Sequence, residues 1–292
     1  MCGKAYKKVF DQSANILWAK FFLDTFTAVV YMAFGGKPEG DKLLICTVIS
    51  WCILYVLLFA RGLISVKSLR ISGRRRKMPF AEFFASLGLI GAVQFITGWL
   101  MEGMDILKDS FGIAIYEESI SAQELSFLAV LMMGVIAPVL EEILFRGIIM
   151  RRIGGKIGMC GGIFFSALLF GLCHMNVEQG TAAFLAGLVF GLAAWKYSLY
   201  PAALLHVINN LYGLLFKIRV EDQDLLGNVL AGVAVLGLIA AEIILLRNKG
   251  SAEGIFRKKD KSVKWRECFA SKRFAFLLIV FSVLTLGNTI FS

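Results

Sequence analysis

The stretch PVLEEILFRGIIM, residues 138–150, places three charged side chains inside an apolar segment that runs from about residue 125 to residue 150. A segment of this length can cross a bilayer as a helix. An ionised group in hydrocarbon costs several kcal/mol, so charges at membrane depth usually face a protein interior or a wet cavity. We therefore expect Glu141, Glu142 and Arg146 to lie inside a helix bundle and to take part in its function.

The two glutamates are not equivalent on a helix. Glu142 and Arg146 are four residues apart on the same face, with the acid on the N-terminal side, which is the favourable order for an ion pair. Glu141 lies about 100° further round the helix and cannot easily share that arginine. The spacing thus gives Glu142 a partner and leaves Glu141 available, so Glu141 is the candidate functional carboxylate.

The composition predicts an all-α, polytopic membrane protein. Hydrophobic residues make up 58% of the 292, against roughly 45–50% in a soluble domain, and the mean hydropathy is +0.74. We expect a bundle of eight or nine transmembrane helices around a polar intramembrane chamber. The apolar runs lie at about 16–34, 43–66, 79–101, 125–150, 157–175, 181–195, 201–216, 225–246 and 274–291.

We divide this single membrane domain into three parts. Residues 1–124 form an N-terminal lead-in of about three spans, residues 125–218 a core that contains the three charged residues, and residues 219–292 the C-terminal spans. Pro138 is expected to kink its helix. The five glycines of residues 153–162 predict a loop or re-entrant segment, after which the next helix starts late.

The net charge of +10 is unevenly distributed. Basic residues crowd the segments 61–77, 151–156 and 247–273, whereas 102–124 and 221–224 are acidic. By the positive-inside rule the basic loops and the N-terminus are cytoplasmic. Orientation and contact with anionic headgroups account for these basic runs, so we expect no nucleic-acid partner.

Cysteine usage gives no further site. The six cysteines contain no C-x-x-C pair, so they indicate neither a disulfide framework nor a thiolate metal site. In the first apolar run Lys20 and Asp24 are four residues apart, and we interpret them as an interfacial pair whose side chains reach toward the headgroups.

The chain has two histidines, His174 and His206, and both lie in apolar runs. Taken singly, a buried histidine is more often structural than catalytic. Here Phe170 precedes His174 by one helical turn, and Asn210 follows His206 by one turn on the same face. Because polar groups in hydrocarbon are driven to find partners, we expect these segments to meet the glutamates in one place.

Such a set can hydrolyse a peptide bond. A carboxylate acts as the general base on a water molecule, and an imidazole shares that water. A second imidazole and a carboxamide donate hydrogen bonds to the developing oxyanion. A zinc site with Glu141, His174 and His206 as ligands stays open, because one glutamate and two histidines match the ligand count of a catalytic zinc.

Three motifs together resemble those of the CAAX-protease and bacteriocin-processing (Abi) family of intramembrane endopeptidases. They are Glu141-Glu142-x-x-x-Arg146, Phe170-x-x-x-His174 and His206-x-x-x-Asn210, in the family's order and spacing. The resemblance implies that Glu141 and His174 activate water and that His206 and Asn210 stabilise the oxyanion. It also implies that Glu142 and Arg146 hold the geometry, with or without a metal.

The resemblance implies a membrane-associated peptide or protein as substrate and an active site that opens to the cytoplasm. We expect an integral protein of a bacterial plasma membrane. Two other functions stay open: a catalytically silent membrane scaffold or regulator, and a proton-coupled transporter that uses Glu141, His174 and His206 as a relay. The absence of a visible inverted repeat argues against the transporter.

Overall fold

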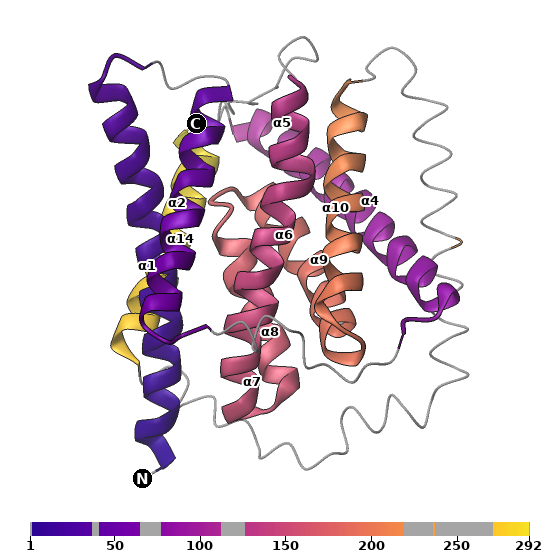
Figure 1. Ribbon diagram of the computed structural model, residues 1–292. Coiled ribbons are helices and arrows are strands. Elements are labelled where there is room, and N and C mark those ends of the chain that lie inside the picture. The colour runs from indigo at the N-terminus through magenta and orange to yellow at the C-terminus, as the bar shows by residue number, and fades with distance from the viewer. Residues whose placement is uncertain are drawn as a thin grey trace.

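The structure, a computed structural model, describes residues 2–36, 41–64, 77–111, 126–218, 236 and 271–291. All regular secondary structure in these ranges is helical, which confirms the predicted fold class (Figure 1). The N-terminus lies at the lower end of the bundle in Figure 1 and the C-terminus at the upper end.

Three helices from the two ends of the chain pack together: α1 (Cys2–Ala33), α2 (Asp41–Ala60) and α14 (Lys272–Phe291). Phe10 of α1 meets the rings of Phe165 and Phe274 edge-on at 5.2 and 4.7 Å. Helix α1 begins well before residue 16, where the first apolar run starts. The helix therefore continues through polar residues that hydropathy alone does not assign to it.

Lys20 and Asp24 form the expected ion pair, but in a different setting. The Lys20 ammonium also donates to Ser50 of α2 at 3.3 Å and lies 4.3 Å from the centre of the Trp51 ring. The Ser50 hydroxyl in turn donates to Asp24. The pair thus joins α1 to α2, a contact that the sequence did not predict, and its interfacial position stays a prediction.

Residues 127–157, which contain the PVLEEILFRGIIM stretch, form one continuous helical column. It consists of α5 (Phe127–Leu131), η2 (Met132–Ile136), α6 (Ala137–Glu142), η3 (Ile143–Met150) and α7 (Arg151–Ile157), of which η2 and η3 are π-helical. The Ala137 N–H donates to the Met132 carbonyl, five residues back. The wider π-turn immediately precedes Pro138, so the irregularity predicted at this proline takes the form of a π-helical segment.

The glycine-rich segment 153–162 is not a loop, and this prediction is wrong. Helix α7 continues to Ile157, and α8 (Met159–Leu172) begins two residues later. Only Gly158 breaks the helix, with φ 95° and ψ 154°, a conformation that favours glycine. A Cβ on Gly162 would lie 2.7 Å from the Gly154 Cα, so the remaining glycines let the two arms pack closely.

The remaining described helices are α9 (Val177–Lys196), α10 (Leu199–Ile218) and α4 (Phe80–Phe111). They share a second apolar cluster, with Ile90, Phe190 and Leu205 at its centre. Lys196 binds Glu82 at 2.5 Å and so ties the end of α9 to the start of α4. Helix α4 extends beyond residue 101 to Phe111, into the acidic segment 102–124.

Four described helical segments are long and apolar enough to cross a membrane: Ala5–Ala33, Phe80–Leu100, Phe127–Ile157 and Val177–Lys196. Leu44–Ala60 and Met159–Leu172 are apolar but shorter. The expected count of eight or nine spans is not confirmed, and the run at 225–246 lies outside the described residues except for residue 236.

The basic ends of several helices gather at one end of the bundle. Arg152 of α7 donates to the Gln12 side chain of α1 at 3.2 Å and to the Leu63 carbonyl, just after α2, at 2.6 Å. Figure 1 shows the N-terminus of α1 and the α7–α8 turn at this same end. The N-terminal part of α1, the segment just after α2 and helix α7 thus meet at one end of the bundle.

Candidate active site

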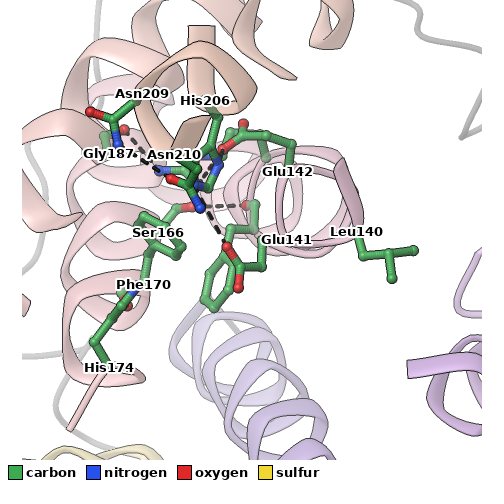
Figure 2. Close-up of polar contacts among 12 residues, drawn as sticks. Leu140, Glu141, Glu142, Ser166, Phe170, His174, Gly187, His206, Asn209 and Asn210 are labelled. Atoms are coloured by element: carbon green, nitrogen blue, oxygen red, sulfur yellow. Dashed lines mark hydrogen bonds and ion pairs between the residues drawn. The ribbon is translucent and has the colours of Figure 1, made fainter. Parts of the chain in front are cut away.

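The two adjacent glutamates occupy different environments at the end of α6 (Figure 2). The Glu142 side chain is fully buried, whereas 23% of the Glu141 side chain is exposed. A helix turns by about 100° per residue, so neighbouring side chains face different surroundings. The structure therefore separates a buried carboxylate from an accessible one, as the spacing predicts.

Glu142 and Arg146 form the predicted ion pair, at 2.7 Å between Oε1 and Nη1, with neither side chain exposed. Arg146 Nη2 also donates to the Gly187 carbonyl of α9 at 3.1 Å. The guanidinium carbon lies 4.6 Å from the centre of the Phe170 ring and 5.4 Å from that of Phe190. Arg146 thus joins three helices, and its surroundings are chiefly aromatic.

Both imidazole nitrogens of His206 face a glutamate. Its Nδ1 lies 3.1 Å from Glu142 Oε1 and its Nε2 lies 3.7 Å from Glu141 Oε2. An ionised carboxylate only accepts hydrogen bonds, so Nδ1 is the donor to Glu142. The ring stacks on Phe190 at 4.7 Å and meets the edge of Phe170 at 5.4 Å, which fixes its plane.

The distance between Glu141 and His206 Nε2 has a chemical consequence. At 3.7 Å the two atoms are too far apart for a direct hydrogen bond but close enough for one water molecule to reach both. Glu141 is also the more exposed of the two glutamates. A water that enters from the accessible side can therefore contact both the Glu141 carboxylate and the His206 ring.

His174 lies just beyond α8 and is not bonded to Glu141 within the described part of the chain. Its Nδ1 is 2.9 Å from the Phe170 carbonyl, and its ring meets the Phe170 ring edge-on at 4.9 Å. Figure 2 shows His174 set apart from Glu141. Phe170 contacts both imidazoles, so its ring is the common neighbour of His174 and His206.

Glu141 and His174 lie at similar distances along the chain from Gly158, the turn between α7 and α8. Glu141 precedes Gly158 by about 17 residues and His174 follows it by about 16, so both lie roughly 25 Å along their arms from the turn. A helix that ended at Met150 would have left them at different depths. The continuation through α7 removes that difference.

Asn210 is held by an irregularity of the neighbouring helix. Its Nδ2 donates to the Met133 carbonyl of η2 at 3.1 Å. In a π-helix each N–H donates to the carbonyl five residues back, as Ala137 does to Met132. The donor to the Met133 carbonyl would then be Pro138, which has no N–H. The proline thus leaves a carbonyl for the Asn210 side chain to occupy.

Three further polar residues contact this region and were missed from the sequence. The Tyr55 hydroxyl of α2 donates to the Leu140 carbonyl, adjacent to Glu141, at 2.5 Å. Asn209 donates to Asn210 Oδ1 at 3.3 Å, and Gln94 of α4 donates to Asn209 Oδ1 at 2.9 Å. The available signal was that each is a polar residue in an otherwise apolar run.

The three residues proposed as zinc ligands do not fit a metal centre as they lie. Among the described residues, no group of three or more His, Cys, Asp or Glu side chains is placed so that it could hold a metal ion. Glu141 and His206 approach each other, but His174 does not join them. As they lie in the structure, Glu141, His174 and His206 therefore do not form a zinc site.

Comparison with known proteins identifies one segment of the chain. Residues 123–212 match the family model described as type II CAAX prenyl endopeptidase Rce1-like. No curated protein and no solved structure matches the chain. The matched segment is under a third of the 292 residues, yet it contains all seven residues predicted from the three motifs. Residues 123–212 are therefore similar to the CAAX-protease family domain.

Proposed function

We propose that this protein is an intramembrane endopeptidase that hydrolyses a peptide bond of a membrane-associated substrate with Glu141 as the general base. One observation carries the proposal: Glu141, an accessible carboxylate at membrane depth, faces His206 at 3.7 Å while Glu142 is held by Arg146. Glu142 already binds Arg146 and His206 through Oε1, so protonating this carboxylate would weaken its ion pair. Glu141 has no such restriction.

In the proposed reaction Glu141 takes a proton from water as the water oxygen attacks the scissile carbonyl carbon. The tetrahedral intermediate collapses, the C–N bond breaks, and the proton is returned to the leaving amine. His174, which lies about as far along the chain from Gly158 as Glu141 does, shares the water once substrate is bound. Catalytic hydrogen bonds are often longer in a structure without substrate, so the present separation of Glu141 and His174 is compatible with this role.

His206 and Asn210 stabilise the oxyanion in this scheme. Because His206 Nδ1 already donates to Glu142, a donor at Nε2 requires a ring that carries both protons. Asn210 has a second N–H besides the one given to Met133. Glu142 and Arg146 keep the His206 ring in place and do not exchange protons with substrate.

The substrate class follows from the family of residues 123–212. A C-a-a-X motif is a C-terminal sequence whose cysteine carries a prenyl group, which anchors the chain to the membrane surface. We propose that such a peptide, or another membrane-anchored peptide, reaches Glu141 from the end of the bundle where the basic helix ends gather. We assign that end to the cytoplasm by the positive-inside rule.

The test is cleavage of a synthetic peptide with a farnesylated C-terminal C-a-a-X sequence by the purified protein in liposomes, with products identified by mass spectrometry. We expect Glu141→Gln to lower the rate by about 10²–10⁴-fold, the usual contribution of a general base. Glu178→Gln is the matched control, because Glu178 is an exposed residue in the first turn of α9. The control should cleave like the wild type.

Other outcomes would overturn the proposal. Cleavage by Glu141→Gln at the wild-type rate would remove Glu141 from the mechanism. Peptide binding without cleavage would favour a scaffold, and proton-coupled flux that Glu141→Gln abolishes would favour a transporter. The same preparation, assayed with and without a strong zinc chelator and analysed for bound metal, tests metal dependence separately.

A further inference from the structure

Three carboxamides form a continuous hydrogen-bonded chain that ends beside the proposed oxyanion site. Gln94 Nε2 donates to Asn209 Oδ1 at 2.9 Å, Asn209 Nδ2 to Asn210 Oδ1 at 3.3 Å, and Asn210 Nδ2 to the Met133 carbonyl at 3.1 Å. The chain thus runs from α4 through α10 to η2. All three side chains are partly buried.

The chain has a direction, and its last acceptor fixes it. The Met133 carbonyl can only accept, so the NH₂ group of Asn210 must face it. The Asn210 oxygen then faces Asn209, whose NH₂ group must point toward it. By the same reasoning the Asn209 oxygen faces the NH₂ group of Gln94. Reversing any one carboxamide would place two donors or two acceptors against each other.

This direction matters for what Asn210 presents to a substrate. One N–H of its NH₂ group is used by Met133, and the other stays on the same nitrogen, on the side away from Asn209. Asn210 lies one helical turn after His206 on the same face of α10, and Figure 2 draws the two side chains next to each other. In the reverse orientation the Asn210 oxygen would replace this donor, and an acceptor repels a developing oxyanion.

We propose that Gln94 and Asn209 are positioning residues that hold the Asn210 carboxamide with its N–H groups toward Met133 and the reaction site. The catalytic part of this inference rests on the proposed function, in which Asn210 stabilises the oxyanion. Gln94 lies in α4, outside the matched residues 123–212. The family domain therefore depends on a helix of the N-terminal lead-in for the orientation of one of its own side chains.

The first test measures the orientation and needs no activity. Protein labelled with ¹⁵N-asparagine gives side-chain NH₂ signals, which Asn209→Ala and Asn210→Ala assign by their loss. Gln94→Met keeps the length of the side chain and removes its carboxamide, and we expect it to shift the signals of both Asn209 and Asn210. Gln179→Met is the control, because Gln179 is exposed on α9.

A shift confined to Asn209, or no shift at all, would overturn the chain whether or not peptides are cleaved. If Gln94→Met does not fold, Gln94→Asn replaces it. This variant retains a carboxamide but shortens its reach by one methylene, and the same two shifts are expected.

The second test measures the consequence for turnover. Loss of one neutral hydrogen bond that fixes an oxyanion donor should lower kcat about tenfold and leave KM within about twofold. In the Asn210→Ala background the same Gln94→Met change should have no further effect, because its route to the site is gone. A full tenfold loss in that background would show that Gln94 acts by another route.

The two proposals fail separately. If the wild type cleaves no peptide but both NMR signals shift, the orientation holds and the enzymatic function falls. If Glu141→Gln abolishes cleavage while Gln94→Met has the wild-type kcat, the function holds and the positioning role is refuted.

Discussion

Arg146 offers the sharpest test of the buried charges. We expect Arg146→Met to destabilise the fold by about 3–5 kcal/mol, because removing one partner of a buried ion pair leaves an uncompensated charge. We expect a loss of stability near the upper end of this range, because neither side chain is exposed and the guanidinium also donates to the Gly187 carbonyl. Methionine keeps much of the aliphatic volume, so the loss reports the charge and not a cavity.

A double variant separates this cost from the value of the pair. In Glu142→Gln with Arg146→Met no ionised group stays buried, and the glutamine oxygen can still accept from His206 Nδ1. Replacing a whole buried pair is often nearly neutral, so we expect the double variant to recover more than half of the lost stability.

The assay is unfolding in detergent followed by tryptophan fluorescence, with Lys156→Met as the exposed control on α7. The control should stay within about 0.5 kcal/mol of the wild type. An Arg146→Met protein that unfolds like the wild type but has lost turnover would refute the reasoning and move Arg146 into the reacting set.

Two further substitutions test the helices around Glu141. Tyr55→Phe removes the donor to the Leu140 carbonyl, so it should cost about 1 kcal/mol of stability and lower turnover. Thermal unfolding and peptide cleavage measure the two effects, with Tyr200→Phe as the exposed control; unchanged values would show that the contact is dispensable. Gly162→Ala should cost about 1–3 kcal/mol of stability by overpacking, because the new Cβ would lie 2.6 Å from the Met150 carbonyl oxygen. The Cβ of the control Gly155→Ala meets nothing within 4 Å, so this variant should unfold at the wild-type temperature. Equal melting temperatures for the two variants would contradict this account.

The helical class and the Glu142–Arg146 pair could be predicted because each follows from local spacing. Hydropathy over a window of about 20 residues identifies a membrane helix, and an i, i+4 pair needs only helical geometry. The catalytic roles of Glu141, His174, His206 and Asn210 remain predictions, since they depend on a substrate.

The sequence was less informative about where helices end. Five glycines in residues 153–162 lower the helical propensity, but packing of α7 against α8 outweighs that cost at every position except Gly158. The partners of Tyr55, Gln94 and Asn209 could not be predicted, because each contact joins helices that are remote in sequence.

The turn at Gly158 places a joint constraint on the lengths of its two flanking arms. Adding one residue between Glu141 and Gly158 would rotate the carboxylate by about 100° and raise it by about 1.5 Å relative to His174. A matching addition in the other arm would restore the level but not the facing direction. Insertions and deletions are therefore not tolerated between Glu141 and His174, even where side chains in this interval can be exchanged.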